Sequence, residues 1–92
     1  MRALERIGQP VTVAGVRQSS HRSRTAKGDT MMFMTLEDLT GMLDIVFFPD
    51  AYRSARSALH HSSSPLLISG EIELDSATLE PLLRAEKVLP VE

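Results

Sequence analysis

Two stretches near the middle of the chain, 31–38 and 42–48, show the period of two that is typical of β-strands, in which successive side chains lie on opposite faces. One face of the two stretches is wholly apolar, and its members are Met32, Met34, Leu36, Leu43, Ile45 and Phe47. Between them, the sequence Asp-Leu-Thr-Gly at 38–41 is typical of a tight turn. The pattern therefore predicts a hairpin of two strands with this apolar face directed into a core.

Three further segments have strand character. Residues 11–16 are rich in valine, and 66–75 and 79–88 carry apolar residues that alternate with polar ones. Glycine inside a strand often marks a bulge or a sharp bend, and Gly15 and Gly70 each interrupt one of these segments. We therefore expect a strand in each segment, with an irregularity at both glycines.

The period changes after the second strand of the central hairpin. Pro49 cannot continue a paired strand, and Asp50 suits the positive end of a helix. Tyr52, Ala55 and Leu59 follow at positions i, i+3 and i+7, which places them on one side of a short amphipathic helix. We expect this side to cover the bottom of the strand assembly.

The predicted order is three strands, one short helix and two strands. This order fits an all-β fold, a five-stranded Greek-key barrel of the OB-fold type with one short α-helix between strands three and four, and a split α+β sandwich is the alternative. Residues 1–9 are interpreted as a lead-in or the remnant of a linker, and 10–90 as the domain. OB-folds bind oligonucleotides with their second and third strands and with two of their loops.

The composition limits the function further. The chain has 92 residues, enough for one domain, and 42% of them are hydrophobic, as in an ordinary globular protein. No apolar run approaches the roughly 20 residues that cross a bilayer. There is no cysteine, which excludes disulfides, thiolate zinc sites and cysteine nucleophiles. We expect a soluble, cytoplasmic monomer without a membrane partner or a cofactor.

The charge is unevenly distributed along the chain. The formal net charge is −2, but the segment 17–28 has no acidic residue and contains Arg17, Arg22, Arg24 and Lys27, so the rest of the chain carries −6. Such a local cluster can attract an anionic ligand although the whole chain is acidic. The polar residues 19–30 predict a loop with its turn at Lys27. We expect its cations to contact phosphates, the alternative being a solvated loop that is basic by chance.

If the apolar face fills the barrel, Phe33, Thr35, Asp44 and Val46 face outward on adjacent strands. An exposed aromatic ring can stack on a nucleic-acid base, which contributes about 1–3 kcal/mol per base. Phe33 is therefore the leading candidate for a binding residue, and we expect the basic loop with Arg22, Arg24 and Lys27 to flank it. Two alternatives stay open: Phe33 packs beneath a loop or a neighbouring domain, or a bulge shifts the register and turns it inward.

Catalytic and metal sites find little support in the sequence. His60 and His61 are adjacent, so they do not project together like two histidines one helical turn apart, and neither they nor His21 have a carboxylate at ligand spacing. The pair Glu37 and Asp38 belongs to a turn, and the serine run 62–64 lacks the flanking glycines of a nucleophile elbow. We expect no metal and no catalysis by this chain.

Residues 11–16, 24–28, 32–41 and 44–49 together resemble the OB domain of the bacterial DNA polymerase III alpha subunit. The most specific elements are Thr-x-Lys-Gly and Thr-Leu-Glu-Asp-x-Thr-Gly, and the similarity covers about 10–90. The resemblance implies a domain near the C-terminal end of a replicative polymerase that holds single-stranded DNA, with catalysis in another domain. The chain would then be one domain of a longer protein or a stand-alone copy.

Related OB domains of class II aminoacyl-tRNA synthetases share the order of residues in the second strand. There, the aromatic residue that matches Phe33 stacks on an anticodon base, so RNA is also a possible partner. The predicted nucleic-acid-binding residues are Phe33, Arg17, Arg22, Arg24, Lys27 and Thr35. Two alternatives are an anticodon-type RNA-binding module and a spacer or protein-interaction domain that has lost nucleic-acid binding.

Overall fold

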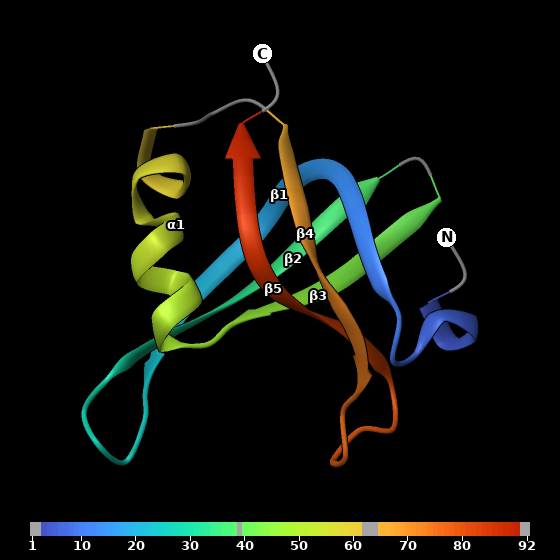
Figure 1. Cartoon of the computed structure of the whole chain (residues 1–92), viewed down its shortest axis with the longest axis horizontal. Helices are drawn as coiled ribbons and strands as arrows, with labels where there is room; N and C mark the ends of the chain where they lie inside the picture. The colour runs from blue at the N-terminus through green and yellow to red at the C-terminus, as the bar shows by residue number, and fades with distance from the viewer. Residues whose placement is uncertain (1–2, 39, 62–64, 91–92) are drawn as a thin grey trace.

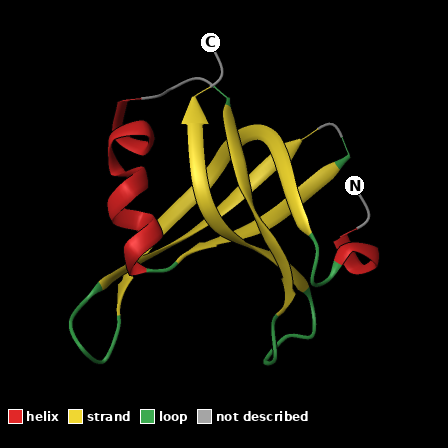
Figure 2. Cartoon of the chain, in the orientation of Figure 1, coloured by secondary structure: helices red, strands yellow, loops and turns green. Residues whose placement is uncertain are grey.

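Five strands close into a barrel in the order β1-β2-β3-β5-β4, with one helix beside it (Figure 1). The computed structural model describes residues 3–38, 40–61 and 65–90. The elements are η1 (Ala3–Arg6), β1 (Pro10–Arg24), β2 (Thr30–Asp38), β3 (Gly41–Phe47), α1 (Pro49–His61), β4 (Leu66–Leu74) and β5 (Pro81–Pro90). The predicted all-β barrel with a short helix between the third and fourth strands is confirmed (Figure 2).

The long strand β1 closes the barrel because it belongs to two pairings. Its first half, 10–15, pairs with β4, and its second half, 16–24, pairs with β2. All neighbouring strands are antiparallel except β3 and β5, which run parallel. β1 bends sharply between its two halves (Figure 1).

The predicted apolar face fills the barrel. Of its six members, Leu43 is partly buried and packs against the core, and the others, Met32, Met34, Leu36, Ile45 and Phe47, are buried. From α1, the predicted stripe of Tyr52, Ala55 and Leu59 enters the same core, so the helix covers one end of the barrel. Each buried large apolar side chain contributes about 1.5–3 kcal/mol to folding.

The two strand glycines differ in their roles. The bulge predicted at Gly70 is confirmed, because the β4–β5 register shifts between Ser69 and Gly70, where a Cβ atom would lie 2.1 Å from the carbonyl oxygen of Arg84. At Gly15 a bulge or a sharp bend was predicted, and β1 bends where its pairing passes from β4 to β2, after Gly15 (Figure 1). The register shift itself lies between Arg17 and Ser19, and Gly15 permits a close approach of β1 to β2.

The prediction of a loop over 19–30 is wrong in its first half. Residues 19–24 are extended and pair with 30–35 of β2, so the loop shrinks to 25–29. The polar side chains of this segment do not prevent strand formation, because the backbone hydrogen bonds are made to β2 whatever the side chains are. Leu79, expected in the last strand, lies instead in a turn with a positive φ of 59°.

The turn between β2 and β3 uses Asp38 and Gly41 as predicted. The Asp38 carboxylate accepts hydrogen bonds from the Thr40 hydroxyl and from the Thr40 backbone N–H, both at 2.7 Å, and these bonds lower the pKa of Asp38. Gly41 has a φ of +139°, which a residue with a side chain rarely adopts. Leu39 of this predicted turn, and the serine run 62–64, lie outside the described residues.

The segment before β1 is attached to the barrel. The Gly8 N–H donates to the carbonyl oxygen of Ile72 at 2.7 Å, and the Ile72 N–H donates to that of Gln9 at 3.2 Å. Within the described part of the chain, no helix is long and apolar enough to cross a membrane, and no group of three His, Asp or Glu side chains is placed to hold a metal ion.

Candidate nucleic-acid interface

The bulge in β1 decides which side chains share a face with Phe33. Before the bulge Arg17 pairs with the inward Leu36, whereas after it His21 pairs with Phe33 and Arg22 pairs with the inward Met32. One extra residue reverses the alternation of the strand that follows it. His21 is therefore on the outer face of the barrel, beside Phe33, and Arg22 is on the opposite face.

His21 and Phe33 form a stacked pair of rings. Their centroids lie 5.3 Å apart and their planes differ by 19°. Phe33 faces outward, as the alternation predicts, and 36% of it is exposed. Because His21 lies against one side of Phe33, the aromatic surface is held in one orientation and extends over β1 and β2.

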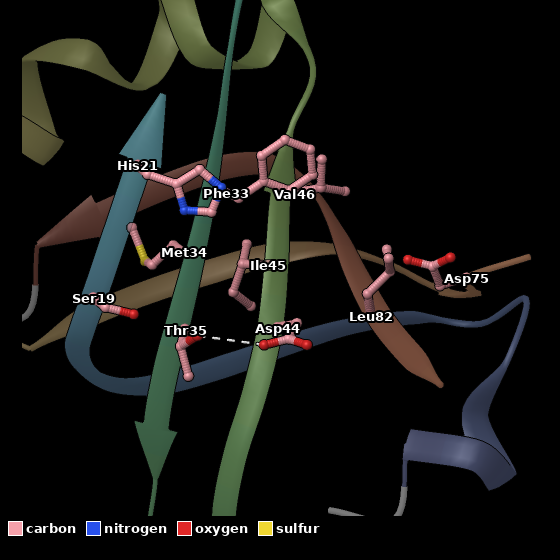
Figure 3. A pocket seen from close by; sticks show the side chains of 10 residues that line it. All are labelled: Ser19, His21, Phe33, Met34, Thr35, Asp44, Ile45, Val46, Asp75 and Leu82. Carbon is pink, nitrogen blue, oxygen red and sulfur yellow. Dashed lines mark hydrogen bonds between the residues drawn. The ribbon is translucent and has the colours of Figure 1, made fainter. Parts of the chain in front are cut away.

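A hollow of about 220 Å³ lies over this pair (Figure 3). It is lined by side chains of β1, β2, β3 and β5 and by Asp75 just after β4. They are Ser19, His21, Phe33, Met34, Thr35, Asp44, Ile45, Val46, Asp75 and Leu82. We call this region the platform hollow. It combines an aromatic wall with polar groups at its rim, and its main strands are those that OB-folds use for oligonucleotides.

Val46 differs from the sequence-based expectation. It was expected on the wetter outer face, but only 5% of it is exposed. Val46 is on the outward face of β3, but it is covered there because it lies between its register partners, Phe33 on β2 and Arg84 on β5. Arg84 is held over the sheet by ion pairs with Glu71 and Glu73. Flanked in this way, Val46 forms a buried apolar floor beside the Phe33 ring.

The polar rim of the platform hollow is acidic. The Thr35 hydroxyl donates a hydrogen bond of 3.3 Å to the Asp44 carboxylate across the β2–β3 pair (Figure 3). Asp44 and Asp75 both line the hollow. Carboxylates repel phosphates but accept hydrogen bonds from the amino groups of bases. The rim is therefore suited to base edges and not to the sugar-phosphate backbone.

The predicted cations do not flank Phe33 as expected. Arg22 and Arg24 project to the face opposite Phe33, because their register partners are Met32 and Thr30. Arg17 donates a hydrogen bond of 2.7 Å to the carbonyl oxygen of Leu59, near the end of α1. Lys27 is exposed in the loop at the tip of the β1–β2 hairpin. Of the predicted binding residues, Phe33 and Thr35 meet at the platform hollow, whereas Arg17, Arg22 and Arg24 gather elsewhere along the hairpin.

Sequence reasoning missed four lining residues of the hollow, namely His21, Asp75, Leu82 and Ser19. His21 was considered only as a metal ligand, and its position beside Phe33 depends on the bulge between Arg17 and Ser19. The polar sequence of that segment gives no sign of the bulge, since no apolar alternation marks its faces. Asp75 and Leu82 lie near Phe33 only through the barrel closure of β3 with β5.

Comparison with known proteins identifies the family of the chain. Residues 11–91 match the family described as OB-fold nucleic acid binding domain. The chain is 40% identical to an error-prone DNA polymerase of Bdellovibrio bacteriovorus and 33% identical to a DNA polymerase III subunit alpha of Pseudomonas fluorescens. Each match extends over 81 residues, which is 88% of this chain. The chain spans only 7% of the length of each of these relatives.

Solved structures share the fold at low sequence identity. Asparaginyl-tRNA synthetase from Pyrococcus horikoshii superposes with a TM-score of 0.71 at 20% identity, covering 96% of this chain and 20% of the other. The structure of RecG bound to a three-way DNA junction gives a TM-score of 0.73 at 17% identity, covering 94% and 12%. The chain belongs to the family of OB-fold nucleic-acid-binding domains, and it is similar to the domain of this kind in DNA polymerase III alpha subunits.

Proposed function

We propose that this domain binds single-stranded DNA on the outer face of β1, β2 and β3, with a base stacked on Phe33 in the platform hollow. The observation that carries the proposal is the His21–Phe33 pair, an aromatic surface fixed beside a hollow. A ring whose orientation is already fixed loses little entropy when a base stacks on it. The binding is non-catalytic, and we propose that chemistry belongs to other domains of a parent DNA polymerase.

The charges around the hollow indicate on which side the bases of the bound strand lie and on which side its backbone lies. Asp44 and Asp75 lie on the β3 and β5 side, and the ion-paired Glu71 and Glu73 lie beyond them on β4. Phosphates are repelled from that side. We infer that the bases point into the hollow and that the backbone lies toward the β1–β2 hairpin, which carries the cations.

The affinity of such a site is modest. Two stacked bases at about 1–3 kcal/mol each, with a few phosphate contacts, give a dissociation constant on the order of 0.1 mM. A site of this strength acts together with other contacts of a longer protein, whose linkage raises the effective concentration. This agrees with a role as an accessory binding site for the template strand within a polymerase of the type that the chain resembles.

The first test is the variant Phe33→Ala, measured by the fluorescence anisotropy of a labelled single-stranded oligonucleotide. Loss of the stacking surface weakens binding by about 1–3 kcal/mol, or about 5- to 150-fold. The matched control is Phe48→Ala. Phe48 is also exposed, at 44%, but does not line the platform hollow, and its removal leaves the affinity unchanged.

The proposal is wrong if Phe33→Ala and Phe48→Ala bind the oligonucleotide equally well while both remain folded. Phe33→Tyr keeps the ring and retains binding, which separates stacking from a general change of the surface. An RNA strand of the same sequence and length is measured in parallel, and tighter binding of RNA would favour an anticodon-type module over a DNA-binding one.

A further inference from the structure

A second surface of the barrel is unexpectedly basic. Three adjoining hollows of about 270, 320 and 350 Å³ lie along the β1–β2 hairpin, and Arg22 lines all three. The first two lie between the hairpin and α1, and the third is lined by the hairpin alone. We call this surface the hairpin–helix cleft. Its basic side chains are Arg17, His21, Arg22, Arg24, Arg53, Arg56 and His60. Arg22 projects to the face of β1 opposite the platform hollow, and His21, which lines both surfaces, lies at the boundary between them.

The local charge of the cleft is strongly positive. Of the ten Lys and Arg residues of the chain, five arginines line it. Among the described lining residues, Asp29 is the single acid. Arg53 forms an ion pair with Asp50 one helical turn earlier, which compensates one more of these charges. An excess of about three positive charges remains in a chain whose net charge is −2.

The fold does not account for this excess. Arg17 has a structural role, because it holds the end of α1 through the carbonyl oxygen of Leu59. Arg22, Arg24 and Arg56 are exposed, and their side chains form no ion pair with any residue that the structure describes. Like charges that gather without counter-charges destabilise the folded chain and attract anions. The arrangement is therefore suited to an external anionic ligand.

We propose that the hairpin–helix cleft binds phosphates of the same DNA strand whose bases lie on the platform hollow. This inference rests on the proposed function. Arginine is suited to the task, because its planar guanidinium group can donate two parallel hydrogen bonds to one phosphate. The residues expected to contact phosphates are Arg22, Arg24 and Arg56, with Arg56 contributed by α1.

The position of β1 connects the two surfaces. Its residues 16–24 pair with β2 on one side, and among the described strands none pairs with their other side. His21 faces the platform hollow and the adjacent Arg22 faces the cleft. A strand that leaves the platform across this open edge passes the small side chains of Ser19 and Ser20 and meets the arginines directly. An acidic protein segment would have no such continuity with a base-stacking site.

The test compares the double variant Arg22→Ala/Arg56→Ala with the matched double variant Arg6→Ala/Lys87→Ala. Both remove two exposed positive charges, but Arg6 and Lys87 lie outside the cleft. Binding of labelled oligothymidylates of about 4 and about 12 nucleotides is measured, and both lengths lie within the range of about 4–16 nucleotides for one OB-fold. The short strand reaches only the platform, and the long strand reaches both surfaces.

We expect the cleft variant to bind the long oligonucleotide about 5- to 30-fold more weakly than the control at low salt, with little change for the short one. The slope of log K against log salt for the long strand becomes shallower by about 1.4, since each phosphate contact on a single strand contributes about 0.7. Thermal unfolding shows whether each variant is folded.

The outcomes separate the two proposals. If Phe33→Ala has no effect on either length, the platform itself is wrong. If Phe33→Ala weakens both lengths but the cleft variant behaves like its control, only the cleft proposal is overturned. It is also overturned if a polyglutamate peptide binds the unmodified domain and loses binding in the cleft variant while DNA affinity is unchanged, since the cleft would then hold an acidic protein segment.

Discussion

At the scale of single residues, Asp44 is the least expected member of the proposed DNA site. A carboxylate beside a nucleic acid is unfavourable unless it faces base edges, and Asp44 lies two residues from Val46, the register partner of Phe33. Its carboxylate already accepts a hydrogen bond from Thr35 and has acceptor capacity left for a ligand. The residue therefore has the chemistry to select among bases.

We predict that the domain prefers oligocytidylate to oligothymidylate. Cytosine presents an N4 amino donor to a carboxylate, whereas thymine presents a carbonyl oxygen that the carboxylate repels. The preference is about 3- to 10-fold, and Asp44→Asn reduces it because the amide can pair with either base. Competition binding of the two pyrimidine strands measures it, and Glu86→Gln on β5 is the control for loss of one exposed negative charge. Equal preference in Asp44→Asn and the unmodified domain would contradict this role.

At the scale of elements, the β1 bulge between Arg17 and Ser19 organises both candidate surfaces. It places His21 beside Phe33 and directs Arg22 and Arg24 toward α1. A regular strand would have placed the two arginines beside Phe33 and His21 on the other side. One additional residue in a strand thus separates the proposed base-stacking surface from the proposed phosphate-binding one.

The second bulge, at Gly70, brings the backbones of β4 and β5 close together, which gives a prediction about stability. In Gly70→Ala the new Cβ would lie 2.1 Å from the backbone oxygen of Arg84, so β4 and β5 must move apart. We expect the free energy of unfolding to fall by about 2–4 kcal/mol, as measured by urea denaturation. Ser69→Ala, which loses only an exposed hydrogen bond to Thr12, costs about 1 kcal/mol or less. A similar loss in both variants would show that the close approach is not the cause.

How far the sequence predicts these elements depends on whether an apolar alternation marks the faces of a strand. The alternation of Met32, Met34 and Leu36 determines the faces of β2, and with them the outward position of Phe33, since only one register buries all three. The helix stripe of α1 is equally clear. The second half of β1 has polar residues on both faces, so neither its extended structure nor its bulge can be inferred from the residues alone.

The pairing of β3 with β5 also cannot be predicted from the sequence pattern. It joins residues about 38 positions apart, such as Ile45 and Leu83, and local periodicity contains no information on such a contact. The burial of Val46 and the positions of Leu82 and Asp75 at the platform hollow follow from this pairing. The aromatic residue of the site could therefore be predicted, but most of its surroundings could not.

At the scale of the whole molecule, the charges are separated by face. The glutamates of β4 and the aspartates of the platform rim occupy one side, and the arginines of the hairpin and of α1 occupy another. A net charge of −2 is therefore compatible with DNA binding, because a strand follows the local potential and not the total charge.

The most direct test of the central claim is a titration of the isotope-labelled domain with a short single-stranded oligonucleotide, followed by backbone-amide resonances. Our account predicts that the largest shifts occur at His21, Phe33, Thr35 and Asp44, the residues of the platform hollow. Shifts confined to the outer face of β4, or no shift at these four residues at saturating oligonucleotide, would contradict it.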